Sequence, residues 1–147
     1  ERELERLRSL IHERANRFML LDVARTRALV LLGRGRWLEA REAIQPRIAS
    51  LVSRKDAWHL TADLAVTAVV GAAVDPAPAA EEAVRAFIDS YRAVKHDEAA
   101  TWWCMRAAEA LLRGRGMAGL ADELGALLEA RIAEVDAAFE APPSRLP

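Results

Sequence analysis

The chain has 147 residues and a mass of 16.2 kDa, a length that indicates one domain with a single core. Alanine accounts for 31 residues and aromatic residues for 5%, so intrinsic preference favours helices and excludes a β-sandwich or barrel. The formal net charge of −1 argues against duplex DNA or an anionic membrane as a partner of the whole molecule. We therefore expect no membrane partner and no direct nucleic-acid binding by this region.

The charges are divided unevenly along the chain. Residues 1–54 hold 12 arginines and seven acidic residues, a net charge of +5, whereas residues 55–147 hold nine basic and 15 acidic residues, a net charge of −6. This split can steer an anionic partner to the first third, or let the basic end of one chain meet the acidic end of another. A solvated helix surface is the third interpretation.

The compartment is predicted from the cysteine and from the apolar runs. Cys104 is the one cysteine, which excludes an intrachain disulfide and favours the reducing cytoplasm. The longest apolar run, Leu64–Val74, is about half of the ~20 residues that cross a bilayer. The sequence starts at Glu1 without an initiator Met or a signal-peptide pattern, so we expect a piece of a larger protein.

The first half of the chain predicts three helices and the start of a fourth. Residues 1–32 contain no glycine or proline and repeat apolar residues at helical spacing, which predicts one long helix or two in succession, ended by Gly33 and Gly35. A second helix should run from Trp37 to about Arg54, with Pro46 kinking it or shifting its start. A third should run over about residues 56–73, and a fourth should begin with Asp75 as its N-cap.

The second half completes three helix hairpins. The fourth helix should end near Lys95, the fifth should run from near Asp97 to the Gly114–Gly116 turn, and the sixth should fill residues 118–139. The proline-rich tail 141–147 should be extended. The hairpins then cover about residues 17–54, 57–95 and 97–135 of a single domain over residues 1–140.

An offset of 40 residues aligns the three hairpins without gaps. It matches small residues in the first helices, Ala28, Ala68 and Ala108, and branched residues in the second helices, Ile44, Val84 and Leu124. Small residues let helices approach closely, and branched ones fill the grooves between them. We therefore predict an all-α fold of three stacked antiparallel helix hairpins with a ~40-residue repeat.

The first hairpin resembles a known repeat family. The stretch 24–44 looks like a tetratricopeptide-type hairpin, with Gly35, Trp37, Ala40 and Ile44 at the family's turn and second-helix positions. The repeat is longer than the family's, which is about 34 residues, and is similar to that of maltose-regulator-like bacterial transcription activators. The resemblance implies a non-enzymatic module of a larger bacterial protein: a scaffold or regulator that takes a protein or peptide partner, or self-associates.

Two arginines, Arg14 and Arg25, interrupt the apolar stripe of the first predicted helix. Eleven residues of separation place them within about 20° around the helix and roughly 16 Å apart along it. This arrangement resembles the first helix of AroQ-type chorismate mutases, and implies as alternatives an all-helical chorismate mutase or a small-anion-binding helical protein. The structural interpretation is that both side chains reach solvent or pair with Asp22 and Glu13.

The remaining candidate residues follow from the histidines, the cysteine and the tryptophans. The three histidines lack metal-ligand spacing, and Cys104 fits a small core residue, so we expect no metal, no cofactor and no catalytic residue. Trp102 and Trp103 point about 100° apart on a helix, so either one lies at an interface or both pack between neighbouring helices. The candidate ligand- or partner-binding residues are Arg14, Arg25, Trp58, Trp103 and Arg106.

Overall fold

The computed structural model describes residues 23–140, and the side chains of residues 23–138. Within that range the backbone forms helices joined by short turns, with no strand. A helix over residues 23–33 is followed by α2 (Trp37–Arg54), α3 (Ala57–Val74), α4 (Ala77–Val94), α5 (Ala99–Gly114) and α6 (Ala118–Glu140). The all-α prediction is confirmed for these residues, whereas the predictions for residues 1–22 and for the tail 141–147 lie outside the described residues.

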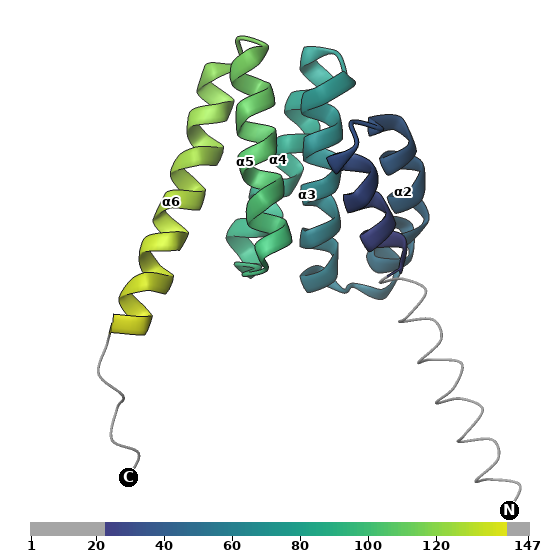
Figure 1. Cartoon of the computed structure of the whole chain (residues 1–147). Coiled ribbons are helices and arrows are strands. Elements are labelled where there is room, and N and C mark those ends of the chain that lie inside the picture. The colour runs from purple at the N-terminus through teal and green to yellow at the C-terminus, as the bar shows by residue number, and fades with distance from the viewer. Residues whose placement is uncertain (1–22, 141–147) are drawn as a thin grey trace, which may run out of the picture.

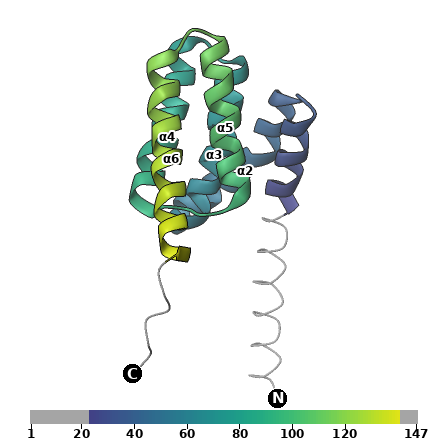
Figure 2. The same cartoon turned by 60° about the vertical axis from the view of Figure 1, so that its left-hand side comes forward.

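The helices stand side by side, with α6 at one end and α2 with the helix 23–33 at the other (Figure 1). The central helix is α3, which packs against α2, α4 and α5, and α5 in turn packs against α6. In the turned view of Figure 2, α3 and α5 lie between α2 on one side and α4 with α6 on the other. This arrangement surrounds α3 with helices.

The central position of α3 explains its composition. By length and hydropathy, with a mean value of 1.4, α3 is the one helix of the described residues that could cross a membrane. Val66, Val69 and Val70 of this helix are fully buried against its neighbours. A helix surrounded on all sides needs apolar residues on all faces, so the packing in the core accounts for the hydropathy.

The 40-residue register is visible in the burial of equivalent side chains. The small residues Ala28, Ala68 and Ala108 are 0%, 1% and 1% exposed. The branched residues at the second set of equivalent positions, Ile44, Val84 and Leu124, are all 0% exposed. The offset found in the sequence therefore identifies side chains that enter the core in each of the three hairpins.

Glycine turns connect the two helices of the first and third hairpins. After the helix 23–33, the N–H of Arg36 donates to the carbonyl of Leu31 at 2.9 Å, and Gly35 adopts φ +69°. The turn between α5 and α6 repeats this geometry around Gly116, at φ +77°. A positive φ strains residues with a side chain but not glycine. The prediction that these glycines form helix-to-helix turns is confirmed.

Two local predictions are corrected in part or in full. Of the two alternatives for Pro46, the shifted start is wrong, because α2 begins at Trp37 and continues as one helix through Pro46; the proline is exposed, so the missing N–H bond lies on the solvent side. Asp75 is not the N-cap of α4: Pro76 holds that position, and Asp75 ends α3. Its carboxylate instead accepts a hydrogen bond from Arg41 of α2 at 2.6 Å, a long-range partner that local spacing does not show.

Candidate functional site

Four consecutive residues, Lys95 to Glu98, connect α4 to α5 and bind elements on different sides of the fold. Lys95 pairs with Glu134 of α6, with Nζ and Oε2 3.2 Å apart, and Asp97 pairs with Arg131 of the same helix. Glu98, the N-cap residue of α5, pairs with Arg25 of the helix 23–33. We refer to residues 95–98 as the α4–α5 link. Its contacts bring several charged and aromatic side chains together.

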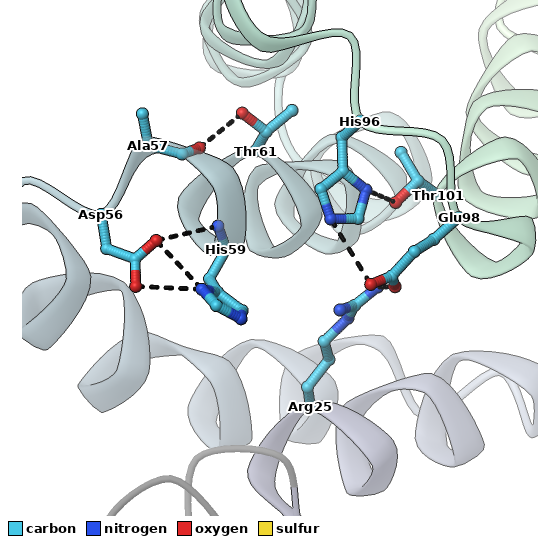
Figure 3. A network of polar contacts seen from close by, with 8 residues as sticks. All are labelled: Arg25, Asp56, Ala57, His59, Thr61, His96, Glu98 and Thr101. Atoms are coloured by element: carbon cyan, nitrogen blue, oxygen red, sulfur yellow. Dashed lines mark hydrogen bonds and ion pairs between the residues drawn. The ribbon is translucent and has the colours of Figure 1, made fainter. Parts of the chain in front are cut away.

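His96 is the buried centre of this link (Figure 3). Its Nδ1 lies 3.1 Å from the hydroxyl oxygen of Thr101, and its Nε2 lies 3.5 Å from Oε1 of Glu98. The imidazole ring also packs against the indole of Trp58, with 4.3 Å between the ring centroids. Burial disfavours the charged imidazolium and lowers the pKa of His96, so the ring is neutral at pH 7.

Arg25 closes the cluster from the side of the first described helix (Figure 3). Its side chain is 12% exposed and its guanidinium donates to the carboxylate of Glu98. Burial is the largest single influence on the pKa of Glu98 and acts to raise it, but the hydrogen bond and the charge of Arg25, together with the nearby histidines, outweigh burial and hold that pKa below its usual range. Arg25 is thus neutralised by a residue 73 positions away. The acids expected from the sequence, Asp22 and Glu13, lie outside the described residues, as does Arg14.

The first turn of α3 supplies the accessible part of the cluster. Asp56 caps this helix by accepting the backbone N–H of His59 at 3.2 Å, and its carboxylate also lies 2.9 Å from Nδ1 of the same imidazole. Burial acts to raise the pKa of Asp56, but the bonds to His59 prevail and lower it. The neighbouring Trp58 is 45% exposed. Arg25, Trp58, His59, His96 and Glu98 are called the His96 cluster below.

A buried ion pair lies between α2 and α3. Nε of Arg47 donates to Oδ2 of Asp63 at 2.6 Å, and the two side chains are 2% and 0% exposed. The second oxygen, Oδ1, accepts no hydrogen bond from the described residues. Burial raises the pKa of Asp63 to about 6, against the opposing effects of Arg47, Arg25 and His59. The positive charges of the cluster therefore act on this carboxylate as well.

The chemistry of the cluster is limited by access. The cluster contains a carboxylate, an imidazole and a hydroxyl in succession, from Glu98, His96 and Thr101. Enzymes use this succession of groups to activate a nucleophile. Because His96 and Thr101 are 0% and 1% exposed, a substrate cannot reach the hydroxyl in this arrangement. Cys104 is also buried, and burial raises its thiol pKa to about 12. His96, Thr101 and Cys104 are therefore enclosed in the core, and the bond between His96 and Thr101 holds the α4–α5 link in place.

The other predicted residues lie further along α5. Trp103 is 46% exposed, whereas its neighbour Trp102 is partly buried against the core, so one of the two indoles lies on the surface. Arg106 pairs with Glu109 and with Glu129 of α6. Within residues 23–138, no three histidine, cysteine or acidic side chains are grouped so that they could hold a metal. The structure thus links Arg25 to Trp58 through Glu98 and His96, and leaves Trp103 with Arg106 in a separate place.

Sequence reasoning did not identify His96, Glu98 and Asp63 as parts of a site. A signal was present for Asp63, because a single carboxylate in an otherwise apolar helix needs a buried partner. No local sequence pattern predicts the pairing of Arg25 with Glu98, because the two residues belong to different hairpins. Comparison with known proteins adds nothing to this, because no family model, no curated protein and no solved structure matches the chain.

Proposed function

We propose that this chain is a non-enzymatic helical-repeat module that binds a protein or peptide partner through the exposed face of the His96 cluster. The observation that carries the proposal is the setting of Trp58: its indole is 45% exposed while its other side rests on the fully buried His96. An aromatic side chain that is held in place before binding loses little conformational entropy when a partner covers it.

The groups around Trp58 define the chemistry of the partner. The indole offers a large apolar face, which suits an apolar side chain of a peptide. Arg25 and Glu98 are neutralised by each other, while His59 is 37% exposed at its side chain and adds hydrogen-bonding capacity beside the ring. This combination of an apolar anchor with polar neighbours suits a peptide segment, whose backbone needs both donors and acceptors.

The arrangement we propose for the hairpins is a tetratricopeptide-like stack, as the sequence resemblance implies. The common burial of equivalent residues in all three hairpins supports it. In such a stack each hairpin packs on the next and the set presents one continuous binding surface. We place this module in a regulatory or scaffolding role within a larger bacterial cytoplasmic protein, on the strength of the resemblance to the repeat region of maltose-regulator-like activators.

Site-specific photocrosslinking tests the proposal. A photoreactive phenylalanine analogue at position 58 should form protein or peptide adducts in cells that express the chain. The same analogue at Val74 is a matched control, because Val74 is 41% exposed and lies at the other end of α3. Adducts specific to position 58 support the proposal; equal patterns from both positions, or none from position 58, contradict it.

The alternative, a chorismate mutase or small-anion site, depends on Arg25. In the structure Arg25 is paired with Glu98, so an anionic ligand would have to displace a carboxylate from it. Chorismate incubated with the purified chain should therefore keep its absorbance over time. Turnover that is lost in an Arg25→Met variant would replace the proposed function with the enzymatic one.

A further inference from the structure

A second set of equivalent positions, unlike those of Ala28 and Ile44, differs in exposure between the three hairpins. In the central helix α3, Asp63, Val66 and Val70 are each 0% exposed. Forty residues earlier and forty residues later, the equivalent side chains are all exposed: Val23, Thr26 and Val30 in the helix 23–33, and Trp103, Arg106 and Ala110 in α5. Helices flank α3 on both sides, whereas among the described residues the outer hairpins are flanked on one side (Figure 1). Both outer hairpins thus expose side chains at positions that are buried in α3.

The end formed by the first hairpin carries an apolar groove. The groove has a volume of about 660 Å³ and follows the outer side of the helix 23–33 towards the start of α2. Val23 and Val30, 62% and 48% exposed, are its apolar wall. Arg27 and Arg34 also line it, and neither forms an ion pair with another described residue. The groove therefore combines apolar surface with two arginines that pair with no described acidic side chain, beside the ion pair of Arg36 with Glu39.

The other end, formed by α5 and α6, carries an exposed aromatic side chain among ion pairs. Trp103 is 46% exposed on the side of α5 opposite the buried Thr101. One turn further along α5, Arg106 pairs with Glu129 of α6, and Arg113, about 15 Å from Trp103 along the helix axis, pairs with Asp122 of α6. The two acidic side chains remain 60% and 63% exposed, so they can face a second positive partner.

The charges of the two ends are opposite. Residues 23–54 contain seven arginines and two glutamates, a net charge of +5. Residues 97–140 contain four arginines and nine acidic residues, a net charge of −5. The two segments lie at opposite ends of the row of helices (Figure 1). Contact between unlike ends of two copies is favoured by charge, whereas contact between like ends is opposed.

We propose that the chain associates with further copies of itself head to tail, with Trp103 of one copy seated in the Val23–Val30 groove of the next. The indole fills the apolar groove, and Arg27 and Arg34 beside it interact with the ring face and with the exposed acids of α6. This contact joins two different surfaces and leaves one of each free, so it adds further copies unless the rotation between neighbours closes a ring. It uses a surface distinct from Trp58 and goes beyond the proposed function.

Sedimentation velocity on the purified chain is the first test. The mass-average size should rise with protein concentration at low salt and fall towards the monomer as salt is raised, because the attraction between the ends is screened. Two variants each block one end: Val30→Asp places a charge in the groove, and Trp103→Ala removes the aromatic side chain. Each should be monomeric at concentrations at which the wild-type chain associates. A wild-type chain that stays monomeric throughout would overturn the proposal.

An equal mixture of the two variants tests the direction of the contact. The Val30→Asp chain keeps an intact Trp103 end and the Trp103→Ala chain keeps an intact groove, so the mixture should form dimers and nothing larger. A twofold dimer through one surface would instead leave one of the variants dimeric alone, and this result would refute the head-to-tail contact. Val74→Ala is the control, because it shortens an exposed apolar side chain on the central helix α3 and should associate like wild type. If Val30→Asp does not fold by circular dichroism, Arg27→Glu combined with Arg34→Glu blocks the same end.

Discussion

Arg47 of α2 and Asp63 of α3 form an ion pair with 2.6 Å between Nε and Oδ2, and both side chains are almost completely buried. The pair joins the first and second hairpins inside the core. A buried pair of this kind contributes little net stability compared with apolar residues, because both charges lose their hydration. Replacing only one of the two residues should cost far more stability, because the remaining charge then stays buried without its partner.

Replacing Arg47 alone should therefore destabilise the chain strongly. For Arg47→Met we expect a loss of about 3–5 kcal/mol in the free energy of unfolding, because Asp63 remains in the core without its donor. Urea unfolding followed by circular dichroism measures the change. The double variant Arg47→Met with Asp63→Leu is the control and should recover most of the loss; a double variant as unstable as the single one would mean that the pair itself is stabilising.

His96 should make stability fall on acidification. Burial lowers its pKa in the folded chain, whereas the unfolded chain takes up the proton near the ordinary value of about 6.5. Neutral His96 therefore makes its full contribution to the free energy of unfolding above about pH 6.5. This contribution is lost as the pH falls towards the folded-state pKa. Unfolding free energies of wild type and His96→Gln between pH 7 and pH 5 should show wild type losing stability relative to the variant. A constant difference across this range would contradict the prediction.

Asp63 should make the free energy of unfolding change with pH in the opposite direction to His96. Its folded-state pKa is about 6, above the ordinary value of 3.8, so the folded chain binds this proton more tightly than the unfolded chain does. The resulting stability is complete below pH 3.8 and is lost as the pH rises through 6. Relative to Asp63→Asn, which does not titrate, wild type should gain stability as the pH is lowered from 7 to 4. A relative loss over the same range would show that the pairing with Arg47 prevails over burial.

The ion pair of Arg25 with Glu98 should be structural. Arg25→Met keeps the apolar part of the side chain but leaves Glu98 without its donor, and we expect a loss of about 1 kcal/mol, since the carboxylate is 43% exposed and water replaces part of the bond. The loss should shrink in high salt. Thermal unfolding of the variant and wild type at two salt concentrations measures both effects. Unchanged or improved stability together with lost binding of a partner would instead assign Arg25 to a binding site.

α3 and α4 approach each other closely at Gly71. A Cβ atom added there would lie 3.0 Å from Cβ of Ala83 and 3.5 Å from Cα of Ala80, so Gly71→Ala should force these helices apart and destabilise by roughly 1–3 kcal/mol. Gly119 of α6 is the matched control, because no atom lies within 4 Å of an added Cβ. Gly119→Ala should change the free energy of unfolding little, because Gly119 is the second residue of α6, where helix propensity counts less than in the interior. Chemical unfolding of the pair gives both values, and equal effects at the two sites would reject the close contact.

The sequence predicted the helices well because their ends are marked locally. Gly35 and Gly116 mark two turns, and Asp56 marks the start of α3. The 40-residue offset also marked residues that are buried in every hairpin, such as Ala28, Ala68 and Ala108, but at Val30, Val70 and Ala110 it did not predict the difference in exposure. Asp75 could not be predicted from its neighbours in sequence. Its side chain is of the type that caps helices, but it accepts a hydrogen bond from Arg41 on another helix.

The candidate site was accessible to sequence reasoning only in part. Trp58 and Arg25 were identified by their residue types and their places on predicted helices. Their connection depends on His96 and Glu98, whose roles arise from contacts between hairpins. Such contacts are set by the angles at which helices pack, and the helical periodicity of a single segment carries no information on those angles.

The bond between Arg25 and Glu98 also bears on how the chain unfolds. In an ideal linear repeat protein each unit touches its nearest neighbours alone, so end units can fray while the rest stays folded. Here the first hairpin is tied directly to the third, and opening either end breaks contacts of the other. We expect these hairpins to unfold in one cooperative transition, with the same midpoint for the tryptophan fluorescence and for the helical signal.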